Sequence, residues 1–189
     1  HRAETTIRKL PFLVVQDLFM NETAEVADVF LPAASFAEKD GTFTNSERRV
    51  QRVRAAIPPV GLSRPDWQIT CEIAQRTLQK LGREPAGFEF SRPSQIFDEM
   101  AAIWPNIGGI SYERMDRDGG LQWPCATPDH PGTRFMYERD FPLGKGRFVP
   151  VEQGPRADEL PDKRYSLILN TGRTLYHWHG GTITTHVDG

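Results

Sequence analysis

Two short apolar runs near the start of the chain predict its first strands. Phe12 to Val15 is wholly apolar, which is typical of a strand buried on both faces of a parallel sheet. Asp28 to Pro32 predicts a second short strand that ends at a proline. Between the two runs, Asn21 can cap a short helix that ends at Ala27. The alternation of strand, helix and strand favours an α/β fold.

Two later segments have the spacing of amphipathic helices. From Asp66 to Leu81 apolar side chains recur at helical intervals, and Gly82 follows as a stop signal. A second helix is predicted from Ser94 to Trp104. We interpret its apolar side chains as core packing and not as cofactor contacts. These side chains are Ile96, Phe97, Met100, Ile103 and Trp104.

The pattern changes after the second helix. From Pro105 to Pro161 neither helical nor strand periodicity is found, and we expect an irregular crossover that lies on a neighbouring surface. A buried strand is then predicted from Tyr165 to Leu169, ending at the polar turn Asn170-Thr171-Gly172. A strand-like run, Thr182 to Thr185, follows near the end. Because the chain starts without methionine and stops just after that run, we expect it to be a piece of a longer polypeptide.

Composition narrows the classes of function. With 23 basic and 25 acidic residues, the net charge of −2 argues against a generally electropositive nucleic-acid binder. Cys71 and Cys125 stand far apart, which excludes a disulfide scaffold and an iron–sulfur cluster held wholly within this chain. No apolar run approaches the roughly 20 residues that cross a bilayer. The sequence therefore predicts neither nucleic-acid binding nor membrane insertion.

A segment rich in hydrogen-bond donors follows the last predicted strand. No carboxylate occurs between Asn170 and His186, and two glycines allow backbone N–H groups to approach a ligand. Such a segment suits an anion, most economically a phosphate or pyrophosphate. The donor side chains are those of Arg173, Thr174, His177, His179 and Thr182.

Two other interpretations of this segment stay open on spacing alone. His177 and His179 would share one face of an extended strand and could bind a transition metal, although the usual further ligands are missing nearby. Alternatively, Thr171-Gly-Arg173 is an ordinary turn at a strand end with a solvated arginine.

Four polar residues in the first half of the chain are candidate ligand contacts. Gln16 and Asp17 follow the first strand, where α/β sheets bind ligands, but they could equally satisfy nearby backbone groups. Lys39 precedes a tight turn and could place its ammonium on a phosphate oxygen. Asp66 lies in the first turn of a helix, where the dipole favours a carboxylate without any ligand. The same carboxylate could accept hydrogen bonds from N1–H and N2–H of guanine, a pair of donors that adenine lacks.

Longer motifs carry a family resemblance. The run Thr171-Gly-Arg-Thr-Leu-Tyr-His-Trp-His-Gly180 resembles the segment with which molybdopterin oxidoreductases open their C-terminal domain and hold one guanine dinucleotide cofactor. The block from Phe12 to Gln68 is similar to the later part of the third domain in that family. Three shorter motifs look more like the formate dehydrogenase α-subunit branch than the nitrate reductases. They are Gly119-Gly-Leu-Gln-Trp-Pro-Cys125, His130-Pro-Gly-Thr133 and Gly144-Lys-Gly-Arg-Phe148.

The resemblance implies an α/β fold made of three parts. Residues 1–104 would be the C-terminal part of an α/β molybdopterin-binding domain, at the end of its doubly wound parallel sheet. Residues 105–160 would be the irregular crossover. Residues 161–189 would start a C-terminal β-barrel domain that binds the molybdopterin dinucleotide.

The resemblance also implies a cofactor and its contacts. The family holds molybdenum or tungsten between two molybdopterin guanine dinucleotides, the bis form of the cofactor. Its metal ligand, its formate-binding arginine and its iron–sulfur cysteines would lie upstream, so no residue of this chain is expected to be catalytic or to bind a metal. Gly180 stands where the family often has threonine, which removes one hydroxyl contact. Matched position by position, the cofactor-binding residues would be Gln16, Asp17, Lys39, Asp66, Thr171, Gly172, Arg173, Thr174, Leu175, His177, Trp178, His179 and Gly180.

The function implied is that of a C-terminal portion of a formate dehydrogenase large subunit. Formate would be oxidised to CO2, and electrons would leave through iron–sulfur clusters. The partners would be the remainder of the same subunit and electron-transfer subunits, NAD-linked ones included, in the cytoplasm. A nitrate reductase is the alternative within the family, and a cofactor-free structural domain of a respiratory complex is the alternative outside it. The presence of Asp66, Lys39 and the Thr171 to Gly180 segment argues against the structural domain.

Overall fold

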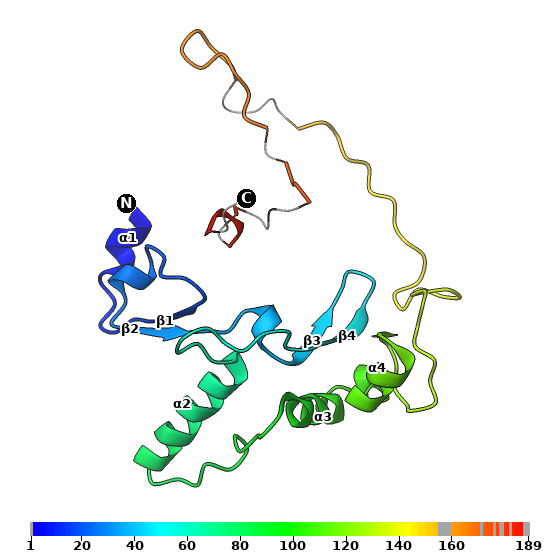
Figure 1. The fold of residues 1–189 in the computed structure, drawn as a ribbon. Coiled ribbons are helices and arrows are strands. Elements are labelled where there is room, and N and C mark those ends of the chain that lie inside the picture. Colours follow the sequence, from blue (N-terminus) through cyan, green and yellow to red (C-terminus); the bar gives the residue numbers. More distant parts are fainter. Residues whose placement is uncertain are drawn as a thin grey trace. The chain divides into compact units, whose positions relative to one another are not determined.

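The computed structural model describes residues 2–154, 160–170, 172–175, 177, 180–181 and 183–186. The chain divides into two compact units, His1–Met136 and Tyr137–Gly189. Figure 1 follows the elements along the sequence by colour. Among the described residues, no helix is both long enough and apolar enough to cross a membrane.

The first unit opens with a short helix and a parallel strand pair. Helix α1 spans Arg2–Ile7, strand β1 spans Val14–Asp17 and strand β2 spans Val29–Pro32. The two strands pair in parallel, as the predicted alternation requires, and the 3-10 turn η1, Ala24–Val26, connects them. The side-chain oxygen of Asn21 accepts a hydrogen bond from the backbone N–H of Ala24 at 3.0 Å, but the residue at the N-cap of η1 is Thr23 and not Asn21 as predicted.

The burial predicted for the first strand on both faces is wrong for this structure. Phe12 and Val14 are exposed. The reason is that β1 and β2 form a two-stranded sheet among the described residues, with no third strand beside them. A wholly apolar run indicates that both faces of a strand can be buried, but it does not identify the elements that would cover them.

A second, antiparallel sheet has the strand order β3-β4-β5. Strand β3 spans Gly41–Thr44, β4 spans Arg49–Val53 and β5 spans Leu121–Gln122. The 3-10 turn η2, Phe36–Glu38, precedes β3. Glu38 is buried, and its carboxylate accepts hydrogen bonds from the backbone N–H groups of Ser35 at 2.8 Å and Val60 at 3.2 Å. These bonds fix the turn that delivers the next residue, Lys39.

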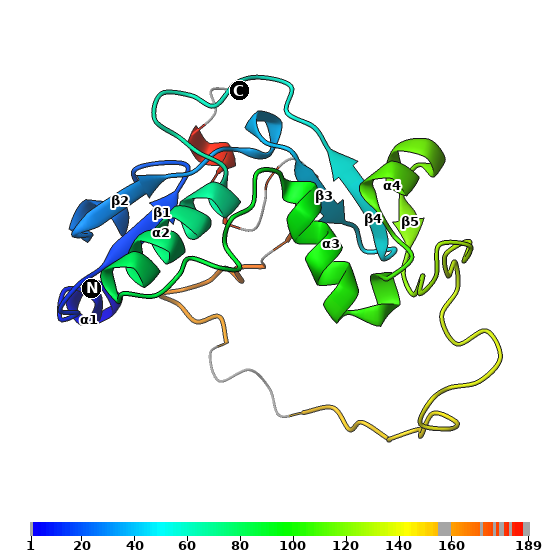
Figure 2. The same cartoon turned by 90° about the horizontal axis from the view of Figure 1, so that it is seen from below.

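Both predicted helices are confirmed. Helix α2 spans Asp66–Lys80 and helix α3 spans Pro93–Ile103. Figure 2 shows α3 beside the β3–β4 hairpin. The start of α2 is tied to the first sheet, because Ala33 and Arg64 form a parallel bridge and the N–H of Ala34 donates to the carbonyl of Arg64 at 2.8 Å.

The segment after α3 is more ordered than its sequence predicts. It contains the 3-10 turn η3, Pro105–Ile107, and the helix α4, Tyr112–Asp118, before β5. Ser111 caps α4, since its hydroxyl accepts a hydrogen bond from the N–H of Arg114 at 3.2 Å. A helix of seven residues is too short for hydrophobic periodicity to reveal.

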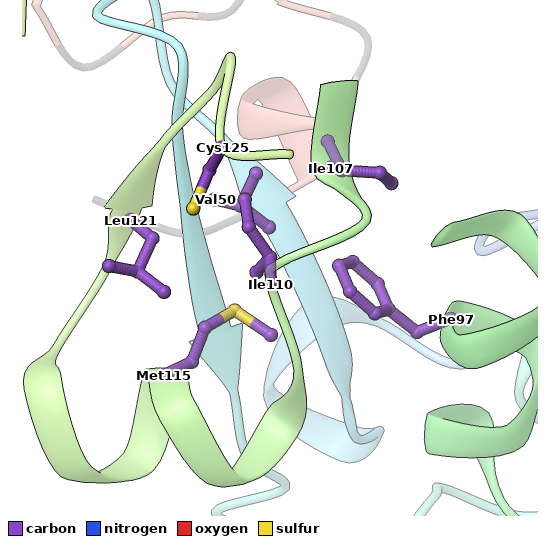
Figure 3. Close-up of a cluster of buried hydrophobic side chains, with 7 residues drawn as sticks. All are labelled: Val50, Phe97, Ile107, Ile110, Met115, Leu121 and Cys125. Atoms are coloured by element: carbon purple, nitrogen blue, oxygen red, sulfur yellow. The ribbon is translucent and has the colours of Figure 1, made fainter. Parts of the chain in front are cut away.

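These short elements complete the hydrophobic core of the first unit. Figure 3 shows its buried side chains converging from β4, α3, α4, β5 and the loops between them. They are Val50, Phe97, Ile107, Ile110, Met115, Leu121 and Cys125.

The interpretation of the apolar face of α3 as core packing is wrong for most of that face. Phe97 is its one residue in the core cluster. Met100 is 44% exposed and Ile103 is 76% exposed. The apolar face of α3 is wider than the core cluster, so part of this face does not pack against the core.

In the second unit, the 3-10 turn η4, Thr184–His186, is the single helix or strand element among the described residues. The predicted buried strand from Tyr165 to Leu169 does not form, and its apolar side chains are exposed, Leu169 at 90%. A strand exists only by pairing with another strand, and no partner for this run is found among the described residues. In the strand-like run from Thr182 to Thr185, Thr182 lies outside the described residues, and Thr184 and Thr185 belong to the turn η4.

Candidate functional site

Three of the predicted site residues meet in the first unit. The Nε2 atom of Gln16 donates to Oδ1 of Asp66 at 2.8 Å. The ammonium of Lys39 forms a hydrogen bond and an ion pair with the other carboxylate oxygen, Oδ2. Residues separated by as many as 50 positions therefore share one polar cluster, which we call the Asp66 cluster.

Each member of the Asp66 cluster is held by a different element. Gln16 lies in β1, opposite Leu31 of β2. Lys39 caps the C-terminal end of η2 in extended conformation. Asp66 is the first residue of α2, where a carboxylate is favoured by the positive end of the helix dipole. The bridge between Ala33 and Arg64 carries α2 back to the strand pair and so brings Asp66 to the other two.

The electrostatics of the cluster keep Asp66 ionised. Partial burial raises the pKa of Asp66, but hydrogen bonds from Lys39 and Gln16 and the positive charge of Lys39 lower it by more. The net result is a pKa below the ordinary value of 3.8. The side chains of Lys39 and Asp66 are 26% and 48% exposed, so both remain accessible to a ligand. A carboxylate offers about four acceptor positions, and Lys39, Gln16 and the backbone of Asp66 itself donate to this one.

Asp17 is the last residue of β1, but its carboxylate forms its hydrogen bonds within its own turn and not with the other members of the Asp66 cluster. Its Oδ1 accepts a hydrogen bond from the N–H of Leu18 at 2.6 Å, and its Oδ2 accepts one from the side-chain amide of Asn21 at 2.8 Å. Both bonds shape the turn after β1. The interpretation that polar side chains here satisfy nearby groups therefore describes the observed contacts of Asp17, and its predicted contact with a nucleotide stays a prediction.

An open groove of about 250 Å³ on the first unit is lined by both Lys39 and Asp66. Residues 40–42 and Trp67 also line it, as do apolar side chains of α3, among them Ile96 and Met100. Gly41 leaves open space where a side chain would otherwise project.

Tyr112, the first residue of α4, also lines the groove. The guanidinium carbon of Arg52 lies 3.7 Å from the centroid of its ring. Burial raises the pKa of Tyr112, although the charge of Arg52 acts in the opposite direction. The phenol is therefore neutral at physiological pH and can donate a hydrogen bond.

Sequence reasoning missed the contribution of α3 and α4 to this groove. Ile96 and Met100 are four residues apart and share one face of a helix. That spacing predicts an amphipathic helix, but it cannot separate a side chain in a core from one that lines a groove. The sequence pattern does not indicate that Tyr112 lines a groove, because it does not predict the helix α4.

The second predicted stretch lies in the second unit, which is described by itself. Thr171, Trp178 and His179 lie outside the described residues. His177 is exposed, and its Nδ1 lies 2.8 Å from the hydroxyl of Thr184. The convergence of this stretch with the Asp66 cluster stays a prediction. The remaining predicted contacts, Gly172, Arg173, Thr174, Leu175 and Gly180, are exposed.

No metal centre is assembled in the part of the chain that the structure describes. Within that part, no three His, Cys, Asp or Glu side chains are grouped so that they could hold a metal ion. Because His179 lies outside the described residues, the alternative of a metal site at His177 and His179 stays untested.

Comparison with known proteins places the chain in a family. The family model described as Molybdopterin oxidoreductase matches residues 1–76. The F420-dependent formate dehydrogenase 2 subunit alpha of Methanococcus maripaludis is 50% identical over 100% of this chain and 27% of its own length. The F420-dependent formate dehydrogenase subunit alpha of Methanocaldococcus jannaschii is 46% identical over 96% of the chain and 26% of its own length.

A third relative, the F420-dependent formate dehydrogenase 1 subunit alpha of Methanococcus maripaludis, is 41% identical over 97% of the chain and 27% of its own length. The chain thus spans about a quarter of the length of these curated relatives. Nearly the whole chain is matched in each case, beyond the residues that the family model covers. As the resemblance of its motifs predicted, the chain belongs to the molybdopterin oxidoreductase family.

Proposed function

We propose that this chain is part of the large subunit of a formate dehydrogenase and that it binds the guanine nucleotide end of a molybdopterin cofactor. The observation that carries the proposal is the convergence of Gln16, Lys39 and Asp66 beside an open groove. Relatives named as formate dehydrogenase alpha subunits, 41–50% identical over 96% or more of the chain, support the choice of reaction.

The residues of the Asp66 cluster fit such a ligand chemically. An ionised carboxylate that lines a groove can accept hydrogen bonds from the two N–H donors of a guanine edge, and the neighbouring ammonium can donate to an oxygen. Gln16 holds the carboxylate from the other side, so the acceptors are fixed in direction before the ligand arrives. When bound, the cofactor would supply the metal centre that takes two electrons from formate, which becomes CO2 and a proton. This chain would contribute binding and orientation.

The rest of the proposal concerns the form of the cofactor, the partners and the surrounding fold. The cofactor would be the bis form with molybdenum or tungsten, iron–sulfur clusters would lie elsewhere in the subunit, and electron-transfer subunits would complete a cytoplasmic enzyme. The parallel pair β1–β2 would extend into a doubly wound sheet. Residues 161–189 would begin a β-barrel domain. The exposed apolar side chains of both regions support this extension, because such side chains are normally covered by further structure.

The experiment uses the complete subunit. Purified protein is analysed for molybdenum and tungsten, and acid hydrolysis is used to release GMP from the cofactor. Turnover is assayed with formate, using F420 and NAD as acceptors, and separately with nitrate. Protein without GMP would favour the cofactor-free structural domain, and activity with nitrate alone would assign the chain to the nitrate reductases.

The decisive variant is Asp66→Ala. We expect GMP content per polypeptide to fall roughly tenfold, because the two guanine donors would lose a charged acceptor. The fold should be retained, since Asp66 is half-exposed and its partners are polar. Thr70→Ala, one turn further along α2 on an exposed position, is the control and should leave GMP content unchanged. An Asp66→Ala protein with full GMP content would contradict the role assigned to Asp66.

A further inference from the structure

Glu38 is a buried carboxylate to which the proposed function gives no role. It is 8% exposed and is the one charged residue among the buried positions that the structure describes. It does not line the groove beside the Asp66 cluster. Burying a charged or polar group is costly unless hydrogen bonds replace those lost to water. The contacts of Glu38 therefore indicate its role.

The two carboxylate oxygens of Glu38 join two segments of the chain. Oε2 accepts a hydrogen bond from the N–H of Ser35, just before η2, at 2.8 Å. Oε1 accepts one from the N–H of Val60, in the loop between β4 and α2, at 3.2 Å. Lys39 directly follows Glu38, and Asp66 starts α2 at the end of that loop. The carboxylate thus ties the segment that carries Lys39 to the segment that carries Asp66.

Backbone hydrogen bonds hold the same loop on the same turn. The N–H groups of Ala56 and Ile57 both donate to the carbonyl of Ala37, at 2.7 and 3.2 Å. Beyond Val60, the N–H and the hydroxyl of Ser63 donate to the carbonyl of Val60 at 3.0 and 2.7 Å. The loop is therefore connected to η2 by backbone bonds as well as by the carboxylate.

The chemistry of the side chain matters at this position, because both partners of Glu38 are donors. A carboxylate accepts with both oxygens, whereas a glutamine of the same size would turn its NH2 group against one of the two N–H groups. Lys39 leaves η2 in extended conformation, with φ −142° and ψ 152°. Its long side chain must give up rotamer freedom to meet Asp66, and a fixed backbone lowers that entropic cost.

We propose that Glu38 is a positioning residue that acts through Lys39: its buried carboxylate holds η2 on the loop before α2 and so sets the ion pair between Lys39 and Asp66. This inference rests on the proposed function and deepens it, because it assigns a role in cofactor retention to a residue that does not line the groove. Among the described residues, the side chains that donate to the Asp66 carboxylate are Lys39 at the end of η2 and Gln16 in β1. A displaced Lys39 would leave Gln16 as the side-chain donor.

The test is a double-mutant cycle in the complete subunit, with Glu38→Gln, Lys39→Gln and the two combined. Each protein is measured for GMP content per polypeptide and for the pH at which half of its guanine nucleotide is released. We expect Glu38→Gln to lower GMP content roughly threefold and to move the release midpoint upward, as Lys39→Gln does. The double variant should match Lys39→Gln alone, because Glu38 has nothing further to position once the ammonium is gone. Glu25→Gln, at an exposed position of the other 3-10 turn η1, is the control and should change neither quantity.

A role in stability alone predicts a different result. Glu38→Gln with a lower thermal unfolding midpoint, a lower GMP content and an unmoved release midpoint would overturn the inference, and so would losses that add in the double variant. If Glu38→Gln does not fold, Ser35→Pro carries the test, because it removes one donor to the carboxylate at a residue whose φ of −69° suits proline. An upward release midpoint in Ser35→Pro would support the inference, and an unmoved one would overturn it.

Asp66→Ala, measured in parallel, separates this inference from the proposed function. Loss of GMP in Asp66→Ala and Lys39→Gln, with full retention and an unmoved release midpoint in Glu38→Gln, would overturn the role of Glu38 and leave the proposed function standing. Full retention in all three variants would overturn both.

Discussion

The Asp66 cluster and the Tyr165 to Gly180 stretch differ in where their structure comes from. The cluster is assembled by contacts within the first unit, through the β1–β2 pair and the bridge that leads into α2. The second stretch carries the longer family motif, yet its apolar run is exposed and unpaired among the described residues. A strong sequence motif therefore does not imply local structural independence. Under the proposed function, we expect the second stretch to pair with strands from elsewhere in the complete subunit.

The largest expected effect tests whether the first unit has a core of its own. Ile107 is 1% exposed within the cluster of Figure 3. Ile107→Ala should lower the free energy of unfolding of the 189-residue chain by about 2–5 kcal/mol, because it leaves a cavity among packed neighbours. Ile103→Ala changes the same residue type at an exposed site and should stay within about 0.5 kcal/mol. Urea unfolding measures both, and equal values would show that the core is not packed as described.

The same comparison separates what the sequence could predict from what it could not. Helix α2 and the position of Asp66 at its start follow from local signals, namely spacing, a preceding proline and a following glycine. The meeting of Gln16, Lys39 and Asp66 does not follow from local signals, because it depends on the pairing of Ala33 with Arg64 across 31 positions of chain. The resemblance to a family named these residues without supplying their geometry.

Two wrong predictions, core packing along the whole apolar face of α3 and a buried strand from Tyr165 to Leu169, have one physical cause. An apolar pattern states that side chains avoid water, but it does not name the surface that covers them. On α3, part of the apolar face lines a groove and not the core. In the run ending at Leu169, the apolar side chains are exposed, and no strand that pairs with the run is found among the described residues. The predicted placement of that run in a β-barrel depends on those partners and stays a prediction.

A second effect is expected at Leu169, and its size should differ between the 189-residue chain and the complete subunit. It tests whether the run from Tyr165 to Leu169 is buried only when strand partners are present. In the 189-residue chain, Leu169→Ala should change the free energy of unfolding by less than about 0.5 kcal/mol, since the side chain is exposed. In the complete subunit, the same change should cost about 2 kcal/mol or more, because the strand would then be paired and buried. Chemical unfolding of the short chain and thermal unfolding of the subunit measure the two cases. A large loss in the short chain would mean that the stretch folds without outside strands, and the contrast between the two regions would disappear.

The smallest expected effect concerns the protonation of Asp66. Burial raises its pKa, but Lys39 and Gln16 lower it by more, so the folded-state pKa lies below 3.8. A lowered pKa means that the ionised form contributes stability above the ordinary value and that this contribution is lost as the pH falls through the folded-state value. Because Asp66 is 48% exposed, the ion pair itself should contribute less than about 1 kcal/mol. The change is therefore easier to detect in ligand retention than in unfolding.

Lys39→Gln should make that change visible, because it removes the ammonium that favours the ionised carboxylate. The pKa of Asp66 should then rise toward its ordinary value, and the pH at which the complete subunit releases half of its guanine nucleotide should move upward. The loss of a donor to an oxygen of the ligand would lower retention at every pH, so the midpoint and not the plateau is the informative quantity. Lys80→Gln removes the same charge from the last turn of α2 and should leave the midpoint in place. Equal midpoints in all three proteins would mean that guanine is not held by an ionised Asp66, which would leave the Tyr165 to Gly180 stretch as the remaining candidate for nucleotide binding.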